Sequence, residues 1–317
     1  MRRDVYASRR CLFENNFHIM PKPVEKTLHK KVNCVRINLY GFQKVKNMNL
    51  QNLHTHTCYC DGADTPEEII ITAIEKGFSA IGFSGHSYMD FSPMFRKLGD
   101  RTEEYKVEVK RLKEKYKDII KVYLGLEVEM YAVPDLSDYE YLIGSAHYFV
   151  IDGQHVDFDR GEKEVEDVIN KYFGGDGMEY AKAYYKILAE LPKLAKFDII
   201  GHFDLITKHS DNREFFDTNS KEYINAAFEA IEALSGKIPL FEVNTGAIAR
   251  GYRKTAYPMP EILKELRRRG FGAVITSDCH DRNKLDYKFD DAAELLRSCG
   301  FKEKYILTDN GFVAVEL

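Results

Sequence analysis

Histidines and carboxylates recur at the ends of short apolar runs in this sequence. His54 and His56 end one run, and further ligand-type residues end the others: His86, Glu127, His147, His202, Asp278 and His280. Imidazole and carboxylate groups are common ligands of borderline divalent metal ions. Because ligands at the carboxyl ends of parallel strands converge on one rim, the pattern predicts a metal site with more than one ion and hydrolytic chemistry.

The first of these runs carries histidines at alternate positions. In His54-Thr55-His56 the strand period of two places both imidazoles on the same side, where they can hold one ion. Asp61 follows in the loop that leaves the strand and can reach a neighbouring ion. A His-x-His pair by itself is as often a packed or surface pair, so the interpretation depends on the ligand-type residues at the other strand ends.

The segments between these runs alternate between helix and strand patterns. Helices are expected over residues 66–76, 100–118, 178–196, 220–234 and 260–269, the first of them capped by Thr65 and ended by Gly77. Strands are expected at residues 50–54, 80–84, 121–127, 141–146, 197–201, 238–243 and 272–277. This alternation is typical of βα units, and the strand number predicts a distorted, TIM-like (β/α)7 barrel of the α/β class.

The composition limits the class of protein. The 317 residues suit one α/β barrel, and no apolar run reaches the roughly 20 residues that a membrane span needs. After residue 47, the chain holds 35 basic and 47 acidic side chains, which argues against a nucleic-acid groove. The six cysteines lack the spacing of a disulfide framework. We therefore expect a cytoplasmic protein without membrane or nucleic-acid partners.

Residues 1–47 differ from the rest of the chain, because they carry eleven Lys and Arg against three acidic residues. They show no sustained amphipathic period and no apolar stretch long enough for a secretory signal, although a transit-like role stays open. Met48 then leads directly into the first ligand run. The sequence predicts a poorly ordered basic extension over 1–47, which a start codon assigned too far upstream would explain, and one functional domain over 48–317.

Taken together, these motifs resemble the polymerase-and-histidinol-phosphatase (PHP) superfamily. The matching positions, in chain order, are His54, His56, Asp61, His86, Glu127, His147, His202, Asp278 and His280. The resemblance extends from Asn49 to about Cys299. Within the superfamily, Gly144-Ser145-Ala146-His147 and the run Phe241 to Gly246 followed by Arg250 are most similar to the stand-alone histidinol-phosphate phosphatases.

The resemblance implies a metal-dependent phosphomonoesterase with three divalent ions, which could be zinc, manganese or iron. In the implied arrangement, the first ion is held by His54, His56, Glu127 and Asp278, the second by Glu127, His147 and His202, and the third by Asp61, His86 and His280. The implied reaction converts L-histidinol phosphate to L-histidinol and phosphate in histidine biosynthesis, by attack of a metal-activated hydroxide on phosphorus.

We expect two of the ligands, Glu127 and Asp278, to be catalytic residues together with Arg250. Arg250 is also expected to bind phosphate, because a guanidinium group can donate two hydrogen bonds to phosphate oxygens, and Lys208 is a weaker candidate. Glu242 and Asn244 lie at the end of the strand expected over 238–243. They could bind the substrate, orient metal ligands or form a buried structural pair, and the sequence leaves these alternatives open.

Other functions stay open as well. A PHP-type phosphodiesterase or nucleotide phosphoesterase would use the same ligands. An amidohydrolase barrel also begins with His-x-His, but that fold usually draws on a carboxylated lysine, whereas Glu127 ends the third strand here. An inactive metal-binding regulatory module would be expected to lack ligands. The expected partner is therefore a small phosphate ester, and the sequence predicts no particular oligomeric state.

Overall fold

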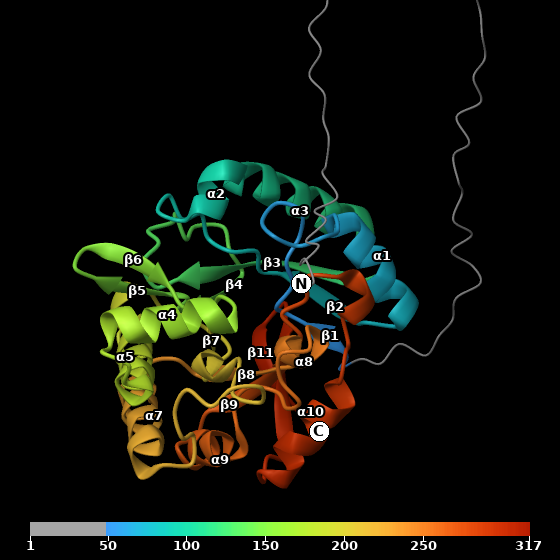
Figure 1. Ribbon diagram of the computed structural model, residues 1–317. Helices are drawn as coiled ribbons and strands as arrows, with labels where there is room; N and C mark the ends of the chain where they lie inside the picture. The colour runs from blue at the N-terminus through green and yellow to red at the C-terminus, as the bar shows by residue number, and fades with distance from the viewer. Residues whose placement is uncertain (1–48) are drawn as a thin grey trace, which may run out of the picture.

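The computed structural model describes residues 49–317, without the side chains of residues 96–98 (Figure 1). The basic extension predicted over residues 1–47 lies outside the described residues.

Parallel strands form the centre of the molecule, and their seven-stranded order confirms the predicted fold class. In spatial order they are β1 (Gln51–Asn52), β2 (Ala80–Phe83), β3 (Lys121–Glu129), β4 (Tyr141–Ser145), β7 (Ile199–Ile200), β8 (Leu240–Asn244) and β9 (Gly272–Thr276). All of the predicted strands are present, most of them shorter than expected. The order follows the chain, so each connection returns to the same end of the sheet, as βα units require.

The barrel closes between its first and last strands at the level of the predicted ligands. Beyond β1 and β9, the amide of His56 donates to the carbonyl of Cys279 at 2.8 Å, and the amide of Cys279 donates to the carbonyl of His54 at 3.0 Å. Thr55 and Cys279 form a parallel bridge there. The strand that carries His54 and His56 is thereby joined to the segment that carries Asp278 and His280.

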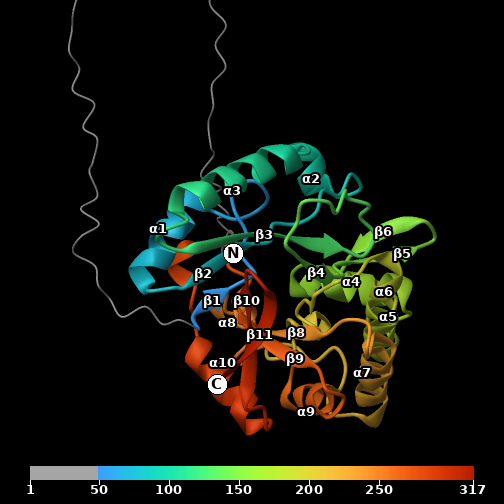
Figure 2. The same cartoon turned by 180° about the vertical axis from the view of Figure 1, so that it is seen from behind.

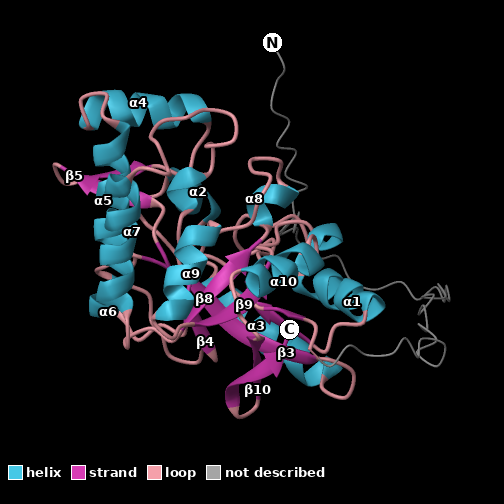
Figure 3. Cartoon of the chain, turned by 90° about the horizontal axis from the view of Figure 1, so that it is seen from below, coloured by secondary structure: helices cyan, strands magenta, loops and turns pink. Residues whose placement is uncertain are grey.

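Helices surround the strands (Figure 3). They are α1 (Pro66–Lys76), α2 (Pro93–Leu98), α3 (Thr102–Tyr116), α4 (Glu162–Tyr172), α5 (Gly177–Leu188), α6 (Leu191–Leu194), α7 (Lys221–Leu234), α8 (Gly246–Ala249), α9 (Pro260–Arg268) and α10 (Phe289–Ser298). Seen from behind, α1 and α3 cover one side of the barrel, whereas α5, α6 and α7 stand at the opposite side (Figure 2). Short 3-10 turns cover Leu205–Thr207 and Arg282–Lys284.

The limits of two predicted helices illustrate what local sequence determines. Helix α1 begins and ends as predicted: Thr65 and Glu68 form a capping box, and Gly77 stops the helix with a left-handed φ of 82°. The single helix predicted over 178–196 is wrong, because the segment forms α5 and α6. Pro192 has no N–H for the carbonyl four residues earlier, and its ring would clash there, so one continuous helix is disfavoured.

The interior of the barrel is filled from below the ligand rim. Tyr141 is fully buried and donates to the carbonyl of Leu53 at 2.6 Å. A Cβ atom at Gly82 or Gly125 would collide with the Tyr141 ring, so these strands need glycine where they face it. The hairpin of β10 (Glu303–Thr308) and β11 (Gly311–Glu316), which the sequence analysis missed, adds Leu307 to this interior cluster.

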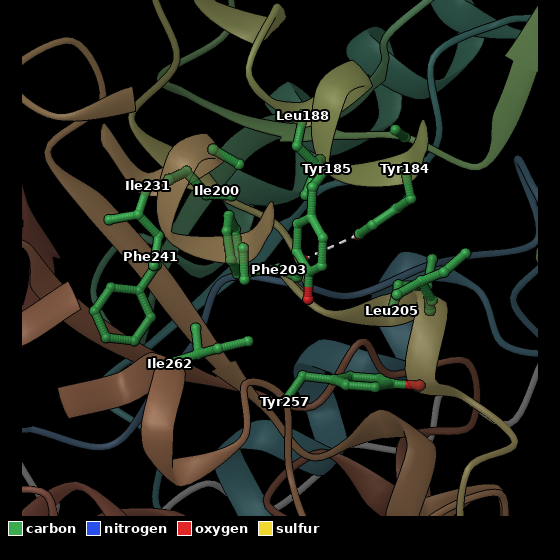
Figure 4. Packing of buried hydrophobic residues seen from close by; sticks show 14 of the residues in the cluster. Tyr184, Tyr185, Leu188, Ile200, Phe203, Leu205, Ile231, Phe241, Tyr257 and Ile262 are labelled. Carbon is green, nitrogen blue, oxygen red and sulfur yellow. Dashed lines mark hydrogen bonds between the residues drawn. The ribbon is translucent and has the colours of Figure 1, made fainter. Parts of the chain in front are cut away.

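The largest core lies between the sheet and α5, α7 and α9 (Figure 4). There the hydroxyl of Tyr184 donates to the carbonyl of Phe203 at 3.2 Å, and both side chains are fully buried. Phe203 directly follows His202. This packing therefore fixes the segment in which a predicted ligand leaves its strand.

Candidate metal centre

The structure brings all nine predicted ligands to one rim of the barrel, at the carboxyl ends of the strands. Three groups of side chains each have ligand atoms within 4.8 Å of one another: His54, His56 and Asp278; His56, Asp61, His86 and His280; and His86, Glu127 and His147. His202 joins them through Glu127, whose Oε1 lies 3.0 Å from its Nε2. Strand ends thus position the ligands, as the barrel topology requires.

The most buried group has the dimensions of a coordination shell. Nε2 of His54 lies 3.3 Å from Oε2 of Glu127 and 3.6 Å from Oδ1 of Asp278, and Nε2 of His56 lies 3.5 Å and 3.1 Å from the same two oxygens. Ligand atoms about 2.1 Å from a tetrahedral ion are about 3.4 Å apart. Among the described residues, the two imidazole nitrogens and Oε2 of Glu127 are buried without a hydrogen-bond partner. These side chains therefore fit a divalent ion.

Glu127 faces two groups with its two oxygens. Oε2 is directed at His54 and His56, while Oε1 lies 3.0 Å from Nε2 of His202 and 3.7 Å from Nε2 of His147. One carboxylate that meets separate pairs of imidazoles has the placement of a bridging ligand. The bridging of a first and a second ion by Glu127 stays a prediction.

The third expected group is less separate from the others. Oδ2 of Asp61 lies 3.2 Å from Nε2 of His280 and 3.6 Å from Nε2 of His86. His86 also places Nδ1 2.9 Å from Oε2 of Glu127, and His56 places Nδ1 3.3 Å from Oδ1 of Asp61. His56 and His86 therefore face two groups each. The division of the ligands among three ions stays a prediction.

Charges in the centre are strongly coupled. Burial alone would lower the pKa of His54, but the carboxylates of Glu242, Glu127 and Asp278 raise it to about 10. Burial would raise the pKa of Glu127, yet His86, His54 and His202 hold it well below its usual value. The carboxylates thus favour positive charge at their centre, which a divalent ion can provide in place of protons on the imidazoles.

Two buried carboxylates orient ligand histidines from behind. Oε2 of Glu242 lies 2.8 Å from Nδ1 of His54, and Oε2 of Glu129 lies 2.9 Å from Nδ1 of His147. Each contact favours the tautomer that leaves Nε2 available as a ligand atom. Sequence reasoning missed Glu129, although its position two residues after Glu127 places both side chains on the same face of β3.

The remaining candidates differ in where they lie. Glu242 and Asn244 are fully buried, and the side-chain amide of Asn244 donates to Oε1 of Glu242 at 2.8 Å. These contacts favour a role in orienting metal ligands over direct contact with the substrate. Arg250 lies at the rim, with its side chain 29% exposed, and donates to Oδ2 of Asp278 at 2.7 Å. Lys208 donates to Asp159 at 2.7 Å, and none of its hydrogen bonds within the described residues reaches a predicted ligand.

Asp278 is a predicted ligand with an unusual backbone conformation. Its φ is 42°, in the left-handed region that few residues other than glycine adopt. Arg250 holds this segment, because its guanidinium donates to both the carbonyl and the carboxylate of Asp278. Burial would raise the pKa of the Asp278 carboxyl, but Arg250 and His54 keep it well below its usual value. Strained backbone held by specific contacts is typical of functional sites.

A seven-stranded βα barrel with this cluster of histidines and carboxylates defines a class of metal-binding barrel. The family model described as PHP domain matches residues 52–246, which is more than half of the chain. The chain belongs to the PHP domain family.

Two curated relatives of the chain are both named as histidinol-phosphatases. It is 28% identical over 263 residues to a "Probable histidinol-phosphatase" of Deinococcus radiodurans, covering 78% of this chain and 92% of that one. It is 23% identical over 268 residues to the histidinol-phosphatase of Bacillus subtilis, covering 77% and 98%. The similarity therefore extends over almost the whole length of these relatives.

A solved structure has the same fold. The histidinol phosphate phosphatase of Lactococcus lactis, complexed with zinc, L-histidinol and phosphate, superposes with a TM-score of 0.62 at 21% identity, over 84% of this chain and 99% of that one. In the described part of the chain, no helix has the length and apolar character needed to cross a membrane.

Proposed function

We propose that this protein hydrolyses L-histidinol phosphate to L-histidinol and phosphate with the help of bound divalent metal ions. The observation that carries the proposal is the group of buried, unpartnered ligand atoms of His54, His56 and Glu127, next to which the partly exposed Arg250 pairs with Asp278. Relatives aligned over nearly their full length are named for the same activity.

The proposed complement is three ions, held by the nine ligands in the sets expected from the sequence. Zinc, manganese and iron all suit imidazole and carboxylate ligands, and zinc is the ion in the Lactococcus lactis structure. When bound, such ions activate water and offset the charge of a phosphoryl group.

The chain's own residues hold and orient the substrate. Arg250 is placed to bind a phosphate oxygen from the rim while it fixes Asp278, since its guanidinium carries more donors than that contact uses. Glu242 and Glu129 keep the ring nitrogens of His54 and His147 directed into the site. None of these roles needs a covalent nucleophile, and burial raises the pKa of the nearby Cys279 thiol to about 12, which keeps it protonated at neutral pH.

The direct test is phosphate release by the purified full chain after zinc, manganese or iron has been restored. L-histidinol phosphate should be hydrolysed with a higher kcat/KM than an aryl phosphate, a nucleoside monophosphate or an aryl phosphodiester. Faster hydrolysis of the diester or the nucleotide would support the alternative phosphoesterases instead. Metal binding without any hydrolysis would support a regulatory module. Elemental analysis of the same samples tests the expected three ions per chain.

For its place in the cell we propose the cytoplasm. The four cysteines in the described part of the chain, Cys58, Cys60, Cys279 and Cys299, form no disulfide with one another, which fits a reducing compartment.

A further inference from the structure

A hairpin brings an additional carboxylate back to the ligand rim. Strands β5 (Tyr148–Ile151) and β6 (Gln154–Asp157) extend away from the barrel directly after His147 (Figure 1). The hairpin returns where the amide of Phe158 donates to the carbonyl of His147 at 3.1 Å. Asp159, the next residue, therefore lies close to a predicted metal ligand although it is twelve positions away in the sequence.

Contacts from a distant segment fix Asp159. Nζ of Lys208 donates to Oδ1 of Asp159 at 2.7 Å and to its carbonyl at 3.3 Å. The Lys208 side chain is only 13% exposed and packs over the ring of Tyr252. Next to it, Nε2 of the buried His209 lies 2.7 Å from the carbonyl of Arg160. Two consecutive residues thus fasten the loop, which holds Asp159 in a defined position.

Asp159 keeps binding capacity after these contacts. Oδ1 of Asp159 accepts the hydrogen bond from Lys208, whereas Oδ2 accepts no hydrogen bond from the described residues. The Asp159 side chain is 31% exposed. Burial would raise the pKa of Asp159, but Lys208, His147 and Arg250 together lower it, so the group is charged at neutral pH. The hydrogen bond from Phe158 to the carbonyl of His147 places Asp159 beside the ligand rim.

Apart from Asp157, the other carboxylates around the centre either face or orient imidazoles, or are fully buried like Asp204 and out of reach of a ligand at the rim. Glu127, Asp61 and Asp278 face the imidazoles as predicted ligands, while Glu129 and Glu242 orient histidines. Asp157 accepts hydrogen bonds from the guanidinium of Arg160 and from the backbone amide of Asp159. Asp159 is thus a charged carboxylate at the rim with an oxygen that can receive a ligand.

We propose that Asp159 binds the ammonium group of the substrate through Oδ2, with Lys208 as the residue that positions it. The inference rests on the proposed function, because L-histidinol phosphate carries an ammonium group on the carbon next to the ester CH2. A substrate held by its phosphate at the metal centre and Arg250 must place this cation close to the rim. A fixed carboxylate there pairs with it, and the same carboxylate gives no advantage to a phosphate ester without an amine.

The experiment compares two substrates that differ only in the amine: L-histidinol phosphate and 3-(imidazol-4-yl)propyl phosphate. In the full-length metal-loaded enzyme, Asp159→Asn should lower kcat/KM for the amine substrate by roughly 10- to 100-fold, the scale of a lost hydrogen bond between charged groups. For the substrate without the amine, the value should change less than about threefold on the same scale. Asp159→Glu keeps the charge and should retain most of the selectivity.

Asp152→Asn is the matched control, since Asp152 lies at the exposed turn of the same hairpin. It should leave both substrates unaffected, and all variants should bind as much metal as the parent. Equal losses for both substrates in Asp159→Asn, or no loss for either, would overturn the inference. If the parent enzyme does not hydrolyse L-histidinol phosphate, the proposed function itself fails, which the parent's own rates reveal separately.

Discussion

The two sides of the barrel rim are built in different ways. On the ligand side, His54, His56, His86 and Glu127 occupy the ends of β1, β2 and β3 or the residues directly after them. On the other side, the wall consists of Asp159, Lys208, Arg250 and Tyr252, which come from the β5–β6 return and from segments that follow β7 and α8. The chemistry is thus placed on rigid strand ends, and the selectivity that we propose is placed on loops.

Burial differs in the same sense. His54, His56 and Glu127 are at most 1% exposed, whereas the side chains of Asp159 and Arg250 are about 30% exposed. A buried charge that loses its partner costs far more free energy than a rim charge that loses one. Substitutions on the ligand side should therefore cause the largest losses of activity, and substitutions on the wall should act on substrate binding and preference.

The largest effect is expected for Glu127→Gln. This change removes a charge from the carboxylate that faces both imidazole pairs, and loss of one partner in a buried charged group costs about 3–5 kcal/mol. Bound metal should fall, and phosphate release should drop by a factor on the order of 100 or more. Elemental analysis and a phosphate-release assay measure both. Glu166→Gln, which changes a half-buried side chain of α4 paired with Arg213, is the control. A Glu127 variant as active as that control would contradict the bridging role.

Smaller losses are expected when the orienting carboxylates are changed. Glu242→Gln and Glu129→Gln keep the shape of the side chain but weaken its hold on His54 and His147. Such partners typically contribute about 10- to 100-fold to metal affinity or activity. Titration with a competing chelator measures the affinity, and thermal unfolding checks the fold. If affinity and rate stayed at the parent values, these contacts would be structural only.

On the wall side, Arg250→Ala should act mainly through substrate binding. The lost charge-assisted contact is expected to cost about 1.5–3 kcal/mol, seen as a raised KM and a weaker inhibition by inorganic phosphate. Because Arg250 also fixes Asp278, Arg250→Lys should recover part of the metal affinity but little of the phosphate binding. Arg213→Ala serves as a surface control. A normal KM in Arg250→Ala would assign the phosphate to another residue.

The smallest effect is expected at the start of the chain. A shortened protein that begins at Met48 should fold and keep its activity within about twofold, because the strands and ligands all follow this residue. Circular dichroism and the phosphate-release assay compare it with the full chain. Loss of solubility or of activity would make residues 1–47 part of the domain, contrary to the predicted boundary.

The ligand side could be predicted because its information is local. A period of two, a helix stop and an apolar run identify a strand end, and a parallel barrel then brings His54, His147 and Asp278 together whatever the loops do. The same logic could have found Glu129. The fold class followed from the alternation of strands and helices for the same reason.

The wall could not be predicted, because it depends on pairings between distant segments. Asp159 and Lys208 are 49 residues apart, and nothing in either neighbourhood indicates the other. The β5–β6 and β10–β11 hairpins were missed as well, since short antiparallel pairs depend on the surface that they pack against. The sequence therefore indicates Lys208 as a candidate phosphate contact, whereas the structure pairs it with Asp159.

The closure of the barrel at His56 and Cys279 links metal binding to the stability of the barrel against local opening. Their two amide hydrogen bonds join the first and last strands, and they lie between ligands that a shared ion would hold together. Amide hydrogen exchange at these positions thus reports how often the ring opens. Metal binding should slow that exchange at both amides. The supply of metal in the cell would then affect the conformational stability of the enzyme as well as its turnover.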